Sequence, residues 1–345
     1  MSKGKLFLTL VVITVIISAI ALPLGKGLKE RKIITLTVAE DEKSLLHLPL
    51  YLALQQGYFA DQGVRVRLTT GSDSADVTLL DPAAYLYEQA RQPAGPVIAA
   101  TVADYEGTFL LARDKKPFTW SSLRGKKIIS YPPESGPALA LDKQLRANGL
   151  APFHNVILYH RIPPDLRLGT FKAGSGDYIQ LSGVQALTAE RDGMGYIATA
   201  VGTGDKTFPA VLCAVSRTAI AKHPEAVQKF INCIYQAQLY LSKEPQLALP
   251  TVRSLAGAKE QPLLEALYAK YSAMGMWQPK PELDQTTFAA LTQAMETAGQ
   301  LPAPVQFDCA VNNEFTVRAA ETVRYSPPEE RQKNRLQKIL DAIIK

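Results

Sequence analysis

Short apolar runs alternate with amphipathic stretches along the first two thirds of the chain. The runs at 33–39 and 64–69 are rich in β-branched residues and predict strands, whereas residues 137–148 carry apolar positions at helical spacing. Proline stands in the first turn of expected helices, where its missing N–H is not needed. We expect strands at 33–39, 64–69, 75–80, 96–103, 125–130, 156–159, 177–181 and 195–199, and helices at 49–59, 83–90, 137–148, 163–173 and 184–191.

The pattern changes after Pro209. One more strand is expected at 210–215, followed by helices at 224–242, 246–256, 261–273, 284–298 and 329–344. Two βα halves with a helical return predict an α/β fold of two lobes, each a mainly parallel sheet flanked by helices. We expect lobe 1 at 32–112 and 205–345, lobe 2 at 113–204, and crossings near 110–116 and 202–209. In such sheets a ligand binds beyond the carboxyl ends of the strands.

The composition is that of a globular protein. With 345 residues, 47% hydrophobic and 20% charged, the chain is long enough for two cores and too apolar to remain disordered. The formal net charge is +6, but no cluster of Lys and Arg is interleaved with aromatic residues. We therefore expect no nucleic-acid partner.

The first 25 residues predict a targeting segment. Lys3 and Lys5 precede an uncharged apolar run at 6–24, which contains a small-residue triplet at 19–21. The pattern is typical of a secretory signal peptide, and the length equally suits a retained membrane anchor. Both alternatives place the rest of the chain outside the cytoplasm, on the periplasmic or extracellular side. No cysteine follows the run, which excludes lipid attachment there.

Cysteine and histidine patterns indicate neither a metal site nor a cofactor. Cys213, Cys233 and Cys309 have apolar neighbours and no Cys-x-x-Cys spacing, so we expect buried thiols. The sequence leaves open whether two of them pair. The four histidines are scattered without metal-ligand spacing.

A series of motifs resembles one known family. Residues 48–54 read Leu-Pro-Leu-Tyr-Leu-Ala-Leu, and Gly57-Tyr58-Phe59 and Gly63-Val64 follow. The proline begins a helix, the apolar residues face a sheet, and the glycines allow tight turns. This combination resembles the NMT1-like, type II periplasmic binding proteins, which serve ABC importers for nitrate, sulfonates, taurine and thiamine precursors.

Further motifs follow in the order of that family between residues 33 and 242, with a looser similarity at 312–320. One departure concerns the ligand, because the family often shows a Glu-Pro pair where this chain reads Gln180-Leu181-Ser182-Gly183. The further motifs are Ala75-Asp76-Val77, Leu123-Arg124-Gly125-Lys126-Lys127-Ile128, Gly149-Leu150-Ala151-Pro152, Asn155-Val156 and Ala221-Lys222-His223-Pro224-Glu225-Ala226-Val227.

The resemblance implies a two-lobed clamp that binds a small molecule and closes around it by hinging at the two crossings. An ABC permease in the membrane is then the partner of the closed form. The resemblance also implies a monomer that binds no nucleic acid, holds no cofactor and performs no catalysis.

Two alternatives to solute delivery stay open. Catalysis has little support, because the Gly-x-Ser-x-Gly elbow, the P-loop and a complete Gly-x-Gly-x-x-Gly motif do not occur; a distant Cys/His pair is not excluded. A membrane-anchored sensing or interaction domain without a dedicated permease would use the apolar segment at 6–24 as its anchor.

Loops that open helices in lobe 1 supply candidate ligand contacts, since a helix N-terminus offers free N–H groups and a positive dipole end. Ser44 and His47 offer hydrogen-bond donors. Gly71 and Ser72 allow close approach, and Asp81 suits a ligand amine. Each of these also has a structural explanation, as a helix cap or a turn residue.

The loop at 131–137 is the strongest candidate in lobe 2. Ser135 and Gly136 place a hydroxyl and bare N–H groups at a helix start, beside Tyr131; a rigid proline-rich turn is the structural alternative. We expect Tyr105, Glu106 and Ser182 to close the clamp as well.

The candidate loops contain no dense group of Arg and Lys, so a small inorganic anion is not favoured. Neutral or zwitterionic organic molecules, including aromatic heterocycles such as pyrimidines, stay open as ligands. Sulfonates also stay open, through helix N-termini and His47.

Overall fold

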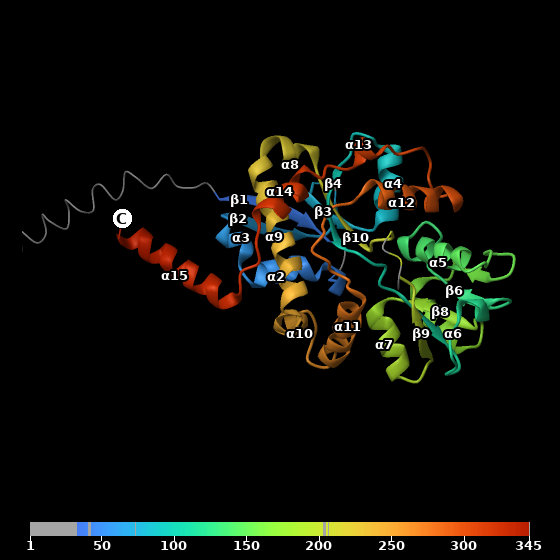
Figure 1. Ribbon diagram of the computed structural model, residues 1–345. Helices are drawn as coiled ribbons and strands as arrows, with labels where there is room; N and C mark the ends of the chain where they lie inside the picture. The colour runs from blue at the N-terminus through green and yellow to red at the C-terminus, as the bar shows by residue number, and fades with distance from the viewer. Residues whose placement is uncertain (1–32, 41–42, 73, 203–204, 206, 345) are drawn as a thin grey trace, which may run out of the picture. The chain divides into compact units, whose positions relative to one another are not determined.

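The computed structural model describes residues 33–40, 43–72, 74–202, 205 and 207–344 (Figure 1). The chain divides into a unit of residues 35–324 and a smaller unit built from its two ends. In the smaller unit, helix α15 (Pro328–Ile344) forms where residues 329–344 predicted one. The predicted targeting segment at 1–25 lies outside the described residues. In the part of the chain that is described, no helix is both long and apolar enough to cross a membrane.

Two five-stranded sheets form the centre of the larger unit, one in each lobe. All nine predicted strands occur, with ends within two residues of the prediction, and the structure adds strand β5. The sheet of lobe 1 has the order β2 (Val64–Thr69), β1 (Ile34–Ala39), β3 (Val77–Leu80), β10 (Val211–Val215) and β4 (Val97–Ala103). The sheet of lobe 2 has the order β7 (Ile157–Tyr159), β6 (Lys127–Ile129), β8 (Tyr178–Leu181), β5 (Phe109–Ala112) and β9 (Tyr196–Ala200).

One strand in each sheet runs against its neighbours. Strand β10 is antiparallel to β3 and β4, and strand β5 is antiparallel to β8 and β9, while β1 pairs parallel with β3 and β6 pairs parallel with β7 and β8. Both antiparallel strands are the ones by which the chain arrives from the other lobe. The predicted class, two mainly parallel sheets flanked by helices, is confirmed.

The predicted boundary of lobe 1 at residue 112 is wrong. Residues 109–112 pair with β8 and β9 in the second sheet, with Phe109 opposite Leu181. The first connection therefore occupies residues 104–108 and not 110–116. The second connection lies between the end of β9 at Ala200 and the start of β10 at Val211.

Helices flank both sheets (Figure 1). Lobe 2 has η2 (Trp120–Leu123), α5 (Gly136–Ala147), α6 (Pro164–Lys172) and α7 (Gly183–Arg191). Lobe 1 has η1 (Leu45–His47), α2 (Leu48–Gln55), α3 (Tyr58–Asp61), α4 (Pro82–Arg91), α8 (Arg217–Lys222), α9 (Pro224–Lys243), η3 (Pro245–Ala248), α10 (Leu249–Ser254), α11 (Gln261–Met274), α12 (Gln285–Thr297), α13 (Phe307–Ala310) and α14 (Glu314–Thr322).

Burial explains why α2 and α9 lie together in lobe 1. Residues 48–53 of α2 are all buried, which is why this helix is apolar on every side. Helix α9 is amphipathic and packs against both α2 and α14. Phe230 of α9 stacks on Phe59 of α3, with ring centroids 5.3 Å apart. Helix α2 thereby fixes the position of η1, the segment directly before it, on the side of lobe 1 that faces lobe 2.

The lobes touch on both sides of their connections. Helix α5 of lobe 2 contacts α4 and α12, and helix α7 contacts α11. The hydroxyl of Tyr271, on α11, donates to the carbonyl of Gly107 over 2.6 Å. The two connections also bond to each other, because the N–H of Val201 donates to the carbonyl of Thr108 over 2.9 Å.

We expect Gly202→Ala to destabilise the protein by roughly 2–4 kcal/mol, because a Cβ at residue 202 would lie 2.2 Å from the carbonyl oxygen of Glu106. Gly169→Ala is the matched control. Residue 169 lies within α6 with nothing near its Cβ, so this change should be neutral or stabilise by up to about 1 kcal/mol. Thermal or urea unfolding measures both, and equal stability of the two variants would show that the connections do not need this close approach.

Candidate functional site

A cavity of about 280 Å³ lies between the lobes. Lobe 1 contributes the η1 loop, the carboxyl end of β3 and both connections, and lobe 2 contributes the start of α5. The cavity is thus at the carboxyl end of a strand, where α/β sheets bind ligands. Its lining residues are Ser44, Leu46, His47, Leu79, Leu80, Asp81, Glu106, Gly136, Pro137, Phe208, Pro209, Ala210 and Val211.

His47 is held in the cavity wall by a buried carboxylate. Its Nδ1 lies 3.0 Å from Oε2 of Glu40, and the hydroxyl of Tyr51 donates to the same oxygen over 2.5 Å. Burial alone would raise the pKa of Glu40, but the bonds from His47 and Tyr51 outweigh it and the pKa is lowered. Glu40 is therefore the carboxylate partner of His47 in the cavity wall. Ser44 caps η1 by accepting from the N–H of Leu46 over 3.2 Å.

Asp81 joins the two lobes. Its Oδ1 caps α4 by accepting from the N–H groups of Ala83 and Ala84, over 2.8 and 3.1 Å. The same carboxylate accepts from the N–H of Gly136 at the start of α5, with Oδ2 at 3.1 Å. Burial raises the pKa of Asp81, against the lowering effect of these three N–H groups. Asp81 thus both caps α4 and contacts the other lobe.

Glu106 is a buried acid in the first connection, only 4% exposed. Its Oε2 accepts from the N–H of Thr108 over 2.9 Å and from the hydroxyl of the same residue over 2.5 Å. The pKa of Glu106 is raised to about 7, chiefly by burial and also by the nearby charge of Asp81, against the lowering effect of the hydrogen bonds from Thr108 and Gly107. No Lys or Arg among the described residues forms an ion pair with it.

Gln180 extends the hydrogen bonds of Glu106 into lobe 2. Its Nε2 donates to the Thr108 hydroxyl over 2.7 Å and to the carbonyl of Pro137 over 2.8 Å, while its Oε1 accepts from Ser130 over 2.9 Å. Gln180 is fully buried. It ties the first connection to the start of α5.

Tyr131, Ser135 and Ser182 do not line the described cavity. The Tyr131 ring lies under the guanidinium of Arg167, with Cζ 3.9 Å from the ring centroid, and its oxygen interacts with Arg167 and the backbone of Ser182. Ser135 caps α5, accepting from the N–H of Ala138 over 3.4 Å. These residues belong to the part of lobe 2 next to the cavity but contribute no side chain to its lining.

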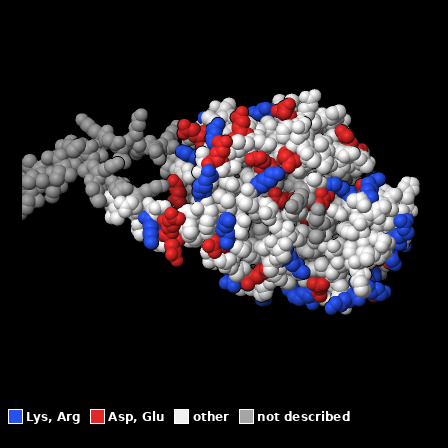
Figure 2. Space-filling model, in the orientation of Figure 1, with Lys and Arg blue, Asp and Glu red and all other residues white. Residues whose placement is uncertain are grey.

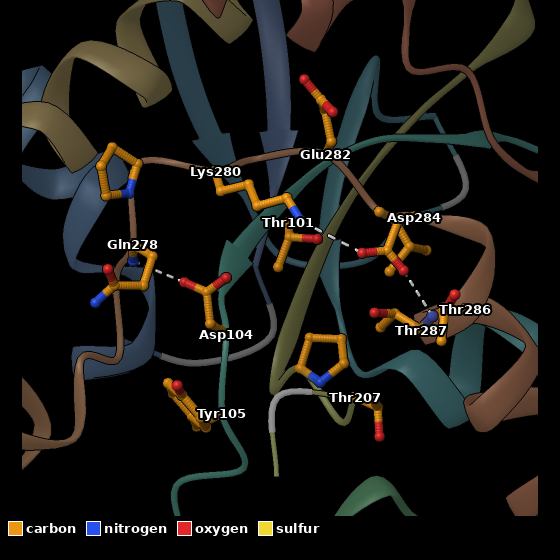
Figure 3. A pocket seen from close by; sticks show the side chains of 13 residues that line it. Thr101, Asp104, Tyr105, Thr207, Gln278, Lys280, Glu282, Asp284, Thr286 and Thr287 are labelled. Carbon is orange, nitrogen blue, oxygen red and sulfur yellow. Dashed lines mark hydrogen bonds and ion pairs between the residues drawn. The ribbon is translucent and has the colours of Figure 1, made fainter. Parts of the chain in front are cut away.

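A larger groove of about 740 Å³ adjoins the connections on the lobe 1 side (Figure 3). Tyr105 lies in this groove. There the carboxylate of Asp104 accepts from the N–H of Gln278 over 2.7 Å, and Lys280 pairs with Asp284 at 3.4 Å. Burial raises the pKa of Asp104 to about 7. No residue of 109–200 lines this groove, so a molecule held there would not join the lobes, and we take the smaller cavity as the candidate site.

The structure brings together five of the eleven predicted contacts: Ser44, His47, Asp81, Glu106 and Gly136. Gly71 and Ser72 follow the edge strand β2 and are exposed outside the cavity. The sequence analysis missed Phe208, Pro209, Ala210 and Val211 in the cavity wall. The sequence feature that could have indicated them is the second crossing, predicted at 202–209, because these residues lie at its end or directly after it.

The lobes differ in charge. Residues 109–200 contain twelve Lys and Arg against seven Asp and Glu, whereas residues 33–108 and 201–324 contain fifteen against twenty-one. On the face in Figure 2, basic side chains dominate the part covered by lobe 2. None of these basic residues lines the cavity.

The thiols are not placed for chemistry in this cavity. Cys213 and Cys233 are buried and free, as predicted, and burial raises the pKa of the Cys213 thiol to about 12. Cys309 is free but exposed, against the expectation of burial. Among the residues with described positions, no three His, Cys, Asp or Glu side chains are grouped as metal ligands.

Comparison with known sequences supports the motif resemblance. The family model described as NMT1/THI5 like matches residues 45–84. The Bacillus subtilis protein YtlA, named as a candidate binding protein, is 25% identical over 301 residues, which cover 83% of this chain and 90% of YtlA. The 4-amino-5-hydroxymethyl-2-methylpyrimidine phosphate synthase of Aspergillus parasiticus is 25% identical over 224 residues, covering 59% of this chain and 65% of the synthase.

Solved structures share the fold. The alkanesulfonate-binding protein SsuA of Xanthomonas axonopodis pv. citri, bound to MOPS, superposes with a TM-score of 0.62 at 18% identity and covers 81% of this chain and 98% of its own. The desulfurization enzyme DszB, as a cysteine-to-serine mutant in complex with biphenyl-2-sulfinic acid, gives 0.63 at 15% identity, covering 84% and 100%. The chain therefore has the two-lobed periplasmic-binding-protein fold, and its resemblance to the NMT1-like binding proteins is confirmed.

The raised pKa of Glu106 predicts a pH-dependent stability. The folded pKa of about 7 exceeds the ordinary value of 4.5, so the folded state binds more protons between these values. The free energy of unfolding should fall by about 3 kcal/mol from this group as the pH rises from 5 to 8. Glu106→Gln should make the decline shallower in urea titrations.

Asp104→Asn is a second, independent variant for this prediction, because Asp104 is also largely buried and its pKa is also raised to about 7. Each single variant should remove one part of the decline, and the double variant should remove more than either. A Glu106→Gln protein with the full wild-type decline would show that Glu106 is ionised freely in the folded state.

Proposed function

We propose that this chain is an extracytoplasmic solute-binding protein, which captures a small organic molecule between its lobes and delivers it to an ABC importer by lobe closure. One observation carries the proposal: the cavity is lined by both lobes, with His47 and Asp81 on one side and Gly136 on the other. A ligand that touches both lobes stabilises the closed arrangement by its difference in affinity for the two states.

The two connections supply the hinge. They bond to each other through Val201 and Thr108, so the lobes turn about a single short region. Glu106 lies in this region and also lines the cavity, which means that a ligand contact there acts directly on the hinge. Hinges of this kind take up the change in backbone angles at a few residues.

The chain binds its ligand without converting it. The similar synthase and DszB are enzymes, so the fold by itself does not distinguish a binding protein from an enzyme. A thiolate nucleophile requires a lowered pKa, whereas burial raises the pKa values of Cys213 and Cys233. Glu106, with its pKa near 7, has the acidity of a general base, but the cavity places no activated nucleophile beside it.

The cellular setting follows from the same proposal. The chain is exported, held as a monomer at the outer side of the cytoplasmic membrane, and its partner is a membrane permease. The similarity to the binding proteins SsuA and YtlA supports this setting, together with the signal-like segment at 1–25. A retained anchor would keep the clamp near its permease.

A thermal-shift screen tests the proposal with sulfonates including MOPS, nitrate, thiamine precursors, flavins and amino acids. A ligand of the folded state at one hundred times its Kd adds about 2.7 kcal/mol to stability, so a true ligand should raise the Tm by a saturable, easily measured amount. Mass spectrometry of the bound compound should return it unchanged. A converted product would favour an enzyme, and a flat screen would count against solute capture.

Gly136→Ala should weaken the binding of any compound found in this way. A Cβ at residue 136 would lie 2.1 Å from Oδ2 of Asp81, so the Asp81 carboxylate must move away from the start of α5 and the contact between the lobes is weakened. We expect the Kd to rise roughly tenfold or more. Gly169→Ala, remote from the cavity in α6, should leave the Kd unchanged, and equal affinity of the two variants would place the ligand elsewhere.

A further inference from the structure

The cavity between the lobes has an excess of carboxyl groups. Among the residues that the structure describes, the ionisable ones in its lining are His47, Asp81 and Glu106, and none of the lining residues is Lys or Arg. His47 does not balance the two acids, because the buried carboxylate of Glu40 lies 3.0 Å from its Nδ1. The basic residues of lobe 2 lie outside the cavity. A ligand anion would therefore enter a region without a free cation to receive it.

The start of α5, where an anion would otherwise bind, is already occupied by the protein itself. The N–H of Gly136 donates to both carboxylate oxygens of Asp81, at 3.2 and 3.1 Å. Only glycine permits this approach, since a Cβ would overlap Oδ2. A helix N-terminus favours negative charge, and here Asp81 provides that charge from the opposite lobe. A sulfonate or a nitrate ion would have to displace it.

Glu106 has partners for hydrogen bonding but none for its charge. Thr108 donates to its carboxylate twice, yet no basic side chain among the described residues pairs with it. The groups that face it electrostatically are Asp81, Tyr131 and Tyr271, which are acidic or phenolic. An ionised carboxylate buried in this way is costly, and a cation brought to the cavity would remove most of that cost.

We propose that the cleft is selective for a small organic cation of the amine or amidine type, whose N–H groups donate to the carboxylates of Glu106 and Asp81. This inference rests on the proposed solute-binding function and narrows its ligand class. The cavity volume of about 280 Å³ limits the bound head group to a small one. Both carboxylates lie beside Gly136 and Pro137, the part of the lining that lobe 2 contributes, so the bound head group would also touch lobe 2 and favour closure.

Two matched series of compounds test the charge preference on the full-length protein. The aromatic series is benzamidine, benzamide and benzenesulfonate, and the aliphatic series is butylamine, butanol and butanesulfonate. Within each series the apolar part is nearly constant while the head group is cationic, neutral or anionic. We expect a saturable rise in Tm with at least one cation, and a smaller rise or none with its neutral and anionic partners.

Variants assign the effect to the cavity. Glu106→Gln keeps the shape of the side chain and removes its charge, so the Kd of the cation should rise roughly tenfold or more. Asp284→Asn removes another carboxylate, which caps α12 and lines the neighbouring groove and not the cavity, and should leave that Kd unchanged. The Tm of each free variant shows that it has folded.

Proton linkage gives a second readout. A cation stabilises the ionised form of Glu106, so the wild-type affinity should increase severalfold between pH 6 and pH 8, and the Gln variant should lose that increase. Stabilisation by a sulfonate but by neither cation would overturn the inference while leaving solute binding intact. No stabilisation by any of the six compounds would also overturn it, and the wider screen then decides solute binding by itself.

Discussion

The close contact of the two inter-lobe connections is the constraint on which the rest of the structure depends. The backbone of residue 202 lies against the carbonyl of Glu106, where a side chain at 202 would not fit. Because of this contact, the position of one lobe relative to the other and the position of the Glu106 carboxyl are set together. The antiparallel strands β5 and β10 continue directly from these connections into the two sheets, so the same contact also aligns the sheets.

A buried polar chain carries this constraint into lobe 2. Glu106 bonds to Thr108, Thr108 to Gln180, and Gln180 to Ser130 and the start of α5. Each member is satisfied, as buried polar groups must be, so the network fixes a unique arrangement. The stacking of Arg167 on Tyr131 covers it from behind. The start of α5 is therefore tied to the first connection through Thr108 and Gln180, neither of which lines the cavity.

The sequence was informative wherever one local pattern decides the structure. Strands and helix starts follow from apolar runs and from residues such as Asp81 and Ser135, which cap the helices they precede. Strand β5 was missed because residues 109–112 have no polar alternation and only five residues separate them from β4. Gly71 and Ser72 failed to reach the cavity because β2 turned out to be an edge strand, and strand order is a long-range property. The roles of Phe208 and Arg167 were not predicted, because their positions depend on contacts between the lobes and between elements far apart in sequence.

Fold and ligand class are decided by different parts of this chain. The periplasmic-binding-protein fold follows from the order of βα units, and SsuA shows that the fold accommodates a sulfonate ligand. The same architecture presents the N-terminus of α5 to the cavity, which would suit an anion if nothing else occupied it. In this chain Asp81 fills that position from the opposite lobe, and Gly136 makes room for it. A single carboxylate at a helix start can thus satisfy the N–H group that would otherwise favour an anion, without any change in the fold around it.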